Sequence, residues 1–239
     1  MRFGLVSYKS KNGDTAYNMA QIERALNETA GKVDMLCFAE AFLQGFDSLK
    51  FDYVTDKPLA VSQDSETMDA LKRLTIEYGT ALLFGYIELN GETFYSSCAL
   101  ISGGALVHNY RRISAGWKLP GADGHYMEGD DTEGFDFFGE HITIALCGDL
   151  WDSPERFATD GLLIWPVYLN YSPEEWEAGV FSEYAEHAGS VAPRVLMINP
   201  LDDDPKAYGG SFAFVRGRAA AGTRLGEESI LIVDTDELR

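Results

Sequence analysis

Short segments with the apolar pattern of β-strands alternate with amphipathic segments of helical period along almost the whole 239-residue chain. Apolar residues that alternate, or that run together between turn residues, predict strands, whereas spacings of three and four predict helices. The predicted strands are residues 2–8, 33–39, 80–88, 93–102, 105–112, 141–147, 161–167, 194–199, 208–215 and 229–234. The predicted helices begin after Asp14, after Asp64 or Ser65, at residue 153 and at residue 173. This alternation predicts an α/β fold with mixed sheets and helices outside them.

The turns between the predicted strands indicate antiparallel hairpins in the middle of the chain. Asn90-Gly91 separates the strands 80–88 and 93–102, and this dipeptide is a strong signal for a two-residue hairpin turn. Gly103-Gly104 then leads into the strand 105–112. Because no linker interrupts the pattern, we expect residues 1–239 to form a single domain.

The charge balance argues against nucleic-acid and membrane-surface partners. The chain has 38 acidic and 19 basic residues, a formal net charge of −19 that repels phosphate backbones and anionic lipids. Residues 162–169 form the longest strongly apolar run, which is far shorter than the ~20 residues of a membrane span. The chain opens with a strand pattern rather than a secretory signal, so we expect a cytoplasmic protein.

The cysteines and acidic residues predict neither a disulfide framework nor a metal site. Cys37, Cys98 and Cys147 are odd in number and widely spaced, which is typical of a reduced protein. The acidic run 202–204 lacks the spaced oxygen ligands and the glycine turn of a calcium site, so we expect a solvated loop.

Two predicted strands end in groups that can do chemistry. Ligands of open α/β sheets gather at the carboxyl ends of strands, and Glu40 directly follows the buried strand 33–39. Desolvation there raises the pKa of a carboxyl group toward values suited to a general base. Cys147 ends the strand 141–147 and is followed by Gly148, which permits close backbone approach, and by a nearby helix start that favours a thiolate.

A cysteine nucleophile needs a base and a group that stabilises the oxyanion. Of the four histidines only His125 is placed within plausible reach of Cys147, so Glu40 is the better base candidate. Arg112 and Lys118 closely follow the strand 105–112 and are the candidate cations.

Motifs that carry these residues resemble those of the nitrilase superfamily of carbon–nitrogen hydrolases. They occur in the same order and cover most of the chain: Phe38-Ala39-Glu40, Phe84-Gly85-Tyr86, Tyr110-Arg111-Arg112, Gly129-Asp130, Cys147-Gly148-Asp149-Leu150-Trp151, Gly209-Gly210-Ser211-Phe212 and residues 228–234. The resemblance implies a four-layer α-β-β-α sandwich with two mixed sheets between outer helices. It also implies a Glu–Lys–Cys triad, no cofactor, a small-molecule amide-type substrate and a homodimer or higher homo-oligomer.

One position departs from the family pattern. The catalytic lysine of the family falls on the last residue of the tyrosine–arginine–lysine motif, which here is Arg112. Arginine is bulkier and planar, so it is not an equivalent substitute. Lys118 is preferred as the catalytic amine beside Glu40 and Cys147, with Arg112, or no cation at all, as alternatives. Arg112, Glu128 and Trp151 are the candidate substrate-binding residues, with ordinary packing as the alternative for Trp151.

The resemblance implies hydrolysis of a non-peptide carbon–nitrogen bond, in a linear amide, a nitrile or a carbamoyl group, through a cysteine thioester. Two alternatives stay open. One is a non-catalytic or regulatory homologue in which Arg112 clamps the carboxylate of a carbonyl metabolite. The other is an acyltransferase that uses the same cysteine but passes the acyl group to an amine or thiol.

Overall fold

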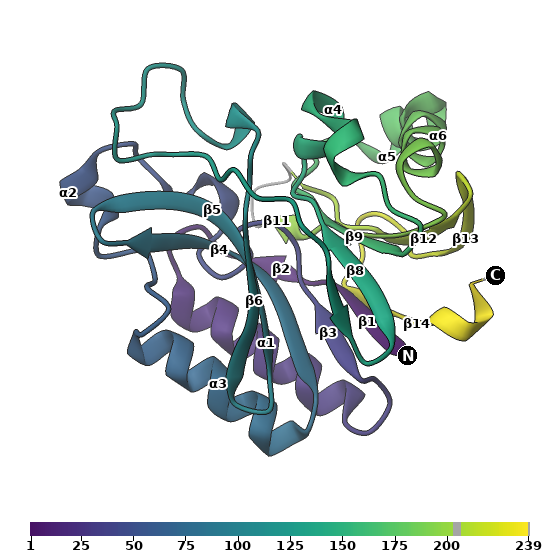
Figure 1. The fold of residues 1–239 in the computed structure, drawn as a ribbon, viewed down its shortest axis with the longest axis horizontal. Coiled ribbons are helices and arrows are strands. Elements are labelled where there is room, and N and C mark those ends of the chain that lie inside the picture. The colour runs from purple at the N-terminus through teal and green to yellow at the C-terminus, as the bar shows by residue number, and fades with distance from the viewer. Residues whose placement is uncertain (203–206, 239) are drawn as a thin grey trace.

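Two six-stranded sheets form the centre of the molecule (Figure 1), which a computed structural model describes for residues 1–202 and 207–238. The first sheet has the order β14-β1-β3-β4-β5-β6. Its strands are β1 (Arg2–Ser7), β3 (Met35–Cys37), β4 (Ala81–Asn90), β5 (Thr93–Ser102), β6 (Ala105–Arg111) and β14 (Ser229–Asp234). β1, β3 and β4 run parallel, and the remaining pairings are antiparallel, so the sheet is mixed as predicted.

The second sheet has the order β13-β12-β10-β9-β8-β7 and is also mixed. Its strands are β7 (Phe135–Phe137), β8 (Glu140–Ile144), β9 (Leu162–Pro166), β10 (Arg194–Ile198), β12 (Ser211–Val215) and β13 (Arg218–Gly222). β8, β9 and β10 are parallel neighbours. The short strands β2 (Lys9–Ser10) and β11 (Leu201–Asp202) pair with each other outside both sheets.

Helices cover the outer face of each sheet. Figure 1 shows α1 (Thr15–Thr29) and α3 (Glu66–Tyr78) together on one side of the molecule and α6 (Phe181–Val191) on the other. Ile22 of α1 and Met68 of α3 belong to a fully buried cluster with Leu36 and Phe84 of the first sheet. The facing side of that sheet contributes Cys37 and others to a second cluster that includes the second sheet and α6. β3 and the first part of β4, as far as Ile87, are therefore buried on both faces, which explains why these stretches are apolar.

The local signals that predicted element ends are present in the structure. The Asp14 carboxylate accepts a hydrogen bond from the Tyr17 amide at 3.0 Å and caps α1. Ser65 caps α3 in the same way, and Gly79 ends that helix in the left-handed conformation, with φ of 62°. Caps and turn residues thus place both helices on the first sheet.

Three features of the second half differ from the predicted pattern. The predicted helix 173–188 consists of α5 (Pro173–Glu175), a π-helical turn (Trp176–Val180) and α6. The strand β13 lies within a segment that was expected to be a loop, because its alanines and exposed Arg218 lack an apolar strand pattern. The strand predicted over 141–147 ends at Ile144, and a one-turn helix, α4 (Asp149–Asp152), begins two residues after Cys147. This start lies ahead of the predicted helix start, where a 3₁₀ turn (Pro154–Phe157) lies.

Other short elements are α2 (Tyr53–Asp56) and 3₁₀ turns at Phe46–Ser48, Ala115–Trp117 and Thr235–Glu237. Among residues 1–202 and 207–238, none of the helices has the length and apolar character needed to cross a bilayer. Of the acidic run predicted to be a solvated loop, Asp202 lies in β11, and positions 203 and 204 fall outside the described residues.

Candidate active site

Glu40 lies three residues after the end of β3, in a tightly packed bend. Its side chain is only 1% exposed, and the next residue, Ala41, has a positive φ of 48°. Gly85 of β4 lies against this bend, because a Cβ at position 85 would fall 2.4 Å from the Ala41 nitrogen and 2.7 Å from the Glu40 Cα. The glycine in the Phe84-Gly85-Tyr86 motif therefore lets the Glu40 segment pack directly on β4.

Arg112 follows β6 and points toward Glu40. Its Nη1 donates to Glu40 Oε1 at 2.7 Å, and both side chains are at most 3% exposed. Its Nε donates to the Ser114 hydroxyl at 2.7 Å, and Ser96 donates to the same Glu40 oxygen at 3.2 Å. The arginine is therefore held in one orientation by partners on two sides.

The second oxygen of Glu40, Oε2, is buried and has no hydrogen-bond partner within the described part of the chain. Burial raises the pKa of Glu40 above the ordinary carboxyl range, and the charge of Arg112 opposes that shift without reversing it. A carboxylate with one oxygen held and the other unpaired is available to accept a proton.

Cys147 lies three residues after the end of β8, in a bend with a strained backbone. Its φ is 42°, an uncommon conformation for a residue with a side chain, and such strain is typical of functional positions. The Cys147 amide donates to the Pro166 carbonyl at 3.0 Å, and its carbonyl accepts from Trp165 Nε1 at 2.9 Å. These bonds hold the backbone, and Cys147 is partly exposed as a residue, whereas Cys37 and Cys98 are fully buried.

The thiol of Cys147 lies within electrostatic reach of Glu40 and Arg112. Burial, followed by the charge of Glu40, raises the pKa of Cys147 to about 12, and Arg112 acts in the opposite direction. The sulfur also lies 3.9 Å from the carbonyl oxygen of Tyr168. At neutral pH Cys147 is therefore a thiol that needs a base, not a preformed thiolate.

Asp149 connects the cysteine bend to the segment that follows Arg112. Its fully buried carboxylate accepts from the Leu146 amide at 2.8 Å and from the Tyr110 hydroxyl at 2.5 Å. The other oxygen accepts from the amides of Ile113 at 3.1 Å and Ser114 at 2.8 Å. This carboxylate therefore sets the separation between the residues that flank Cys147 and Arg112.

Lys118 and Glu128 lie in the same loop and contact each other. Lys118 Nζ is 2.7 Å from Glu128 Oε1 and donates to the Tyr126 carbonyl at 2.7 Å. Within the described residues, neither side chain has a hydrogen bond or ion pair with Glu40 or Cys147. The ion pair with Glu40 is made by Arg112 and not by Lys118.

Trp151 lies on α4, beyond the cysteine bend. Its ring is 38% exposed and stacks on His187, with the ring centres 3.9 Å apart. It also meets Tyr184 edge-on at 5.1 Å. Trp151 is thus part of an aromatic group next to the bend, and the surface of its ring is accessible.

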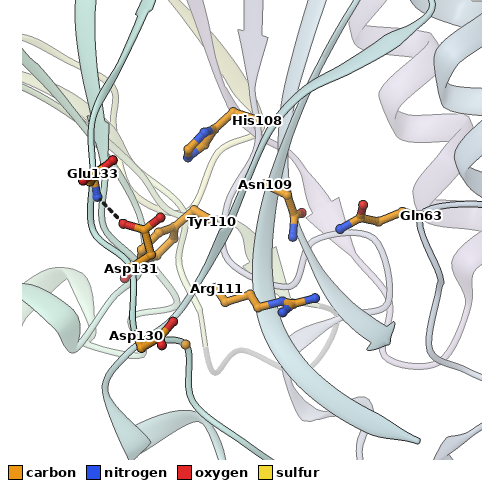
Figure 2. Close-up of a pocket in the computed structure, with 9 residues that line it drawn as sticks. Gln63, His108, Asn109, Tyr110, Arg111, Asp130, Asp131 and Glu133 are labelled. Atoms are coloured by element: carbon orange, nitrogen blue, oxygen red, sulfur yellow. Dashed lines mark hydrogen bonds between the residues drawn. The ribbon is translucent and has the colours of Figure 1, made fainter. Parts of the chain in front are cut away.

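A separate cavity of about 260 Å³ lies beside β6 (Figure 2). Figure 2 shows Asp131 and Glu133 on one side and Gln63 with Asn109 on the other. Arg111 lines this cavity and pairs with the buried Glu88 at 2.7 Å, so the adjacent arginines of the Tyr110-Arg111-Arg112 motif serve different carboxylates.

Sequence reasoning did not single out Ser96, Ser114 or Tyr168, since nothing in their local pattern marks them. The four hydrogen bonds that Asp149 accepts show that its carboxylate shapes the loop around it. Across residues 1–202 and 207–238, no cluster of three histidine, cysteine or acidic side chains is arranged to hold a metal ion.

Residues 2–151 match the carbon-nitrogen hydrolase family, and the chain belongs to this family, within the nitrilase superfamily. The chain is 26% identical over 150 residues to an (R)-stereoselective amidase of a Pseudomonas species. The match covers 63% of this chain and 52% of the amidase, so the chain spans about half the length of that relative.

Solved structures of the superfamily share the fold. XC1258 from Xanthomonas campestris, a CN-hydrolase superfamily protein with an arsenic adduct in its active site, superposes with a TM-score of 0.81 at 16% identity, covering 100% of this chain and 92% of that one. A mutant amidase from Nesterenkonia sp. AN1, in which acrylamide has added to the active-site cysteine, has a TM-score of 0.77 at 15% identity, covering 98% and 92%. The predicted four-layer α-β-β-α sandwich is thereby confirmed.

Proposed function

We propose that this chain is an amidase-type carbon–nitrogen hydrolase that cleaves a small linear amide through a thioester on Cys147. Glu40 acts as the general base and Arg112 as the cation. The proposal rests on one observation above all: the Glu40–Arg112 ion pair leaves Glu40 Oε2 buried and unpaired within electrostatic reach of the Cys147 thiol. A nitrile or a carbamoyl group is a further substrate type for the same nucleophile.

In the first half of the reaction, Glu40 takes the thiol proton while the sulfur of Cys147 attacks the carbonyl carbon. The carbon–oxygen π electrons move onto oxygen, and Arg112 stabilises the oxyanion. Collapse of the tetrahedral intermediate breaks the carbon–nitrogen bond, and protonated Glu40 returns its proton to the nitrogen as ammonia or an amine leaves. A positioned general base typically contributes ~10²–10⁴ in rate.

In the second half, water replaces the departed amine. Glu40 removes a proton from this water as its oxygen attacks the thioester carbon. The second tetrahedral intermediate expels the sulfur, which recovers a proton from Glu40, and the carboxylic acid leaves. Both halves use the unpaired Glu40 oxygen, which explains why one oxygen of a buried carboxylate is left without a partner.

Arg112 is assigned as the cation because of its contacts. Within the described residues, its Nη2 has no hydrogen-bond partner, while Nε and Nη1 are held by Ser114 and Glu40. Two N–H donors are thus available to an oxyanion next to Cys147. Lys118 is assigned to a different role, in which its pairing with Glu128 holds the two ends of a loop together.

The relatives support a hydrolytic assignment. The Pseudomonas relative is an amidase, and the Nesterenkonia amidase carries its acrylamide adduct on a cysteine. We further propose that the exposed ring of Trp151 contacts the substrate and that the protein acts as a homodimer or higher oligomer. Light scattering during gel filtration tests the second statement.

The proposal is tested by measuring ammonia release from a panel of acetamide, propionamide, butyramide, benzamide, propionitrile and N-carbamoyl amino acids. We expect turnover of at least one amide by the wild-type chain and loss of at least ~10³-fold in Cys147→Ala and Glu40→Gln. The matched control Cys98→Ala keeps its activity. No turnover of the panel, together with no adduct on Cys147 after acrylamide treatment, contradicts the proposal.

The two alternative functions give different results in the same experiment. An acyltransferase yields more product when an amine or hydroxylamine is added than its hydrolysis rate accounts for. A non-catalytic homologue binds a carboxylate ligand through Arg112, which calorimetry detects, and releases no ammonia.

A further inference from the structure

The guanidinium of Arg112 lies between two glycines. A Cβ placed on Gly148 would fall 2.6 Å from Arg112 Nη2, and one placed on Gly116 would fall 3.0 Å from the same nitrogen. The first distance is shorter than real Cβ contacts, and the second would require Nη2 to move by a few tenths of an ångström. The space that Nη2 occupies therefore exists because neither residue has a side chain.

The backbone does not require glycine at position 148. Gly148 has φ of −66° and ψ of −12°, right-handed helical values that every L-residue adopts. It also lies directly after Cys147, at the start of α4, where Ser, Asn or Asp are the usual caps. The contact with Arg112 is the steric reason that remains for a missing side chain.

We propose that Gly148 is a positioning residue for Arg112: the absent side chain at 148 is what admits a guanidinium, rather than a slimmer amine, beside Glu40 and Cys147. The catalytic meaning of this pairing rests on the proposed function, but the steric pairing itself does not. Gly116, in the 3₁₀ turn that follows Arg112, has the same effect with a looser contact.

The direction of the effect follows from how Arg112 is held. Ser114 and Glu40 bind its Nε and Nη1, so a methyl group at 148 cannot push Nη2 aside without rotating the whole planar group. Rotation breaks the bond to Glu40 and moves the free donors away from the thiol. A lysine at position 112 has no second nitrogen, so the same methyl group then meets no comparable obstacle.

The experiment is a double-mutant cycle of the wild type, Gly148→Ala, Arg112→Lys and the double variant. We expect Gly148→Ala to lower kcat/KM by ~30-fold or more in the wild-type background but by less than ~3-fold when residue 112 is lysine. This coupling of at least about tenfold lies within the range for residues in direct contact. Additive effects, with the same loss in both backgrounds, overturn the inference.

Alanine substitutions at two further glycines should give smaller losses of kcat/KM than Gly148→Ala. Gly116→Ala should show a smaller loss with the same dependence on residue 112. Gly124→Ala is the matched control, because a Cβ there would meet nothing within 4 Å, and it should leave kcat/KM unchanged. An equal loss in Gly124→Ala and Gly148→Ala also overturns the inference.

A readout without turnover separates this inference from the proposed function. We expect Gly148→Ala to lower the melting temperature by roughly 2–4 °C in the wild-type background, the shift that a modest loss of stability causes in a chain of this length. With lysine at position 112 the shift should be less than about 1 °C. If the chain hydrolyses no amide but the melting temperatures couple in this way, the pairing stands and the proposed function fails. If amides are hydrolysed but neither kcat/KM nor melting temperature couples, the pairing fails and the function stands.

Discussion

Arg112 donates to the carboxylate of Glu40 across 2.7 Å, and neither side chain is more than 3% exposed. Each charge compensates the other in a place where both side chains are almost fully buried. Removing one partner of a buried pair typically costs ~3–5 kcal/mol because the remaining charge is left uncompensated. The pair is therefore a structural necessity as well as the proposed catalytic unit.

The first prediction concerns this pair. We expect Glu40→Gln and Arg112→Met each to lower the free energy of unfolding by ~3–5 kcal/mol. The double variant should lose less stability than the two single variants lose together, since it leaves no unpaired buried charge. Urea unfolding of the four proteins measures the coupling, with the exposed pair Arg24 and Glu28 as a control that gives at most ~1 kcal/mol. Additive losses at Glu40 and Arg112 contradict the account.

The second prediction concerns alkaline pH. The folded pKa of Cys147, about 12, exceeds the ordinary value of 9.0, chiefly because of burial and then because of Glu40. Between these values the folded thiol keeps a proton that the unfolded thiol has lost. The stabilisation linked to this proton is present below about pH 9 and is lost as the pH rises toward 12.

Urea unfolding of the wild type and of Cys147→Ser at pH 7, 9 and 10.5 measures this effect. The stability of the wild type relative to Cys147→Ser should fall above pH 9. One proton sets an upper limit of ~1.4 kcal/mol per pH unit, and we expect a smaller slope because the residue is partly exposed to solvent. A difference that stays constant with pH means that the thiol is not shifted.

The third prediction separates the two cations. Arg112→Met removes the donors assigned to the oxyanion, and we expect kcat/KM to fall by roughly 10²–10³-fold. Lys118→Met removes a pair with Glu128 that is partly exposed, so kcat should change by less than about threefold, and any larger effect should appear in KM. Steady-state kinetics decide between them. The reverse order of effects returns the catalytic role to Lys118.

The fourth prediction concerns Asp149. Its carboxylate accepts four hydrogen bonds, three of them buried, and Asp149→Ala leaves these donors unpaired at a cost of ~1–3 kcal/mol for each buried donor. We expect a loss of at least ~3 kcal/mol in urea unfolding and loss of activity. Tyr110→Phe, which removes one of the four bonds, should lose about 1 kcal/mol. Asp152→Asn, exposed on the same short helix, is the control and should change stability by less than ~0.5 kcal/mol.

Much of the fold was predictable because local and long-range preferences agree. β3 and the first part of β4, as far as Ile87, pack on both faces, so these stretches are apolar, and Asp14 and Ser65 cap the helices that cover them. β13 was not predictable from periodicity, because an edge strand with three exposed or half-exposed alanines has no apolar pattern. The π-helical turn at Trp176–Val180 is likewise invisible in a helical period.

The candidate site was predictable where it depends on strand ends and not where it depends on loops. Glu40 and Cys147 are candidates from the sequence because each follows a buried strand. In the structure they lie within electrostatic reach of each other. The choice between Arg112 and Lys118 depends on the path of residues 113–133, which no local pattern determines. Ser114, which holds the Arg112 guanidinium, was missed for the same reason.

The central claim, that Cys147 is the nucleophile activated by Glu40 beside Arg112, is tested most directly by intact and peptide mass spectrometry after incubation with an amide and rapid acid quenching. We predict an acyl adduct on Cys147 alone, absent from Cys147→Ala and strongly reduced in Glu40→Gln, while the fully buried Cys37 and Cys98 stay unmodified. An adduct on either of those cysteines, or an equal yield with and without Glu40, contradicts the account.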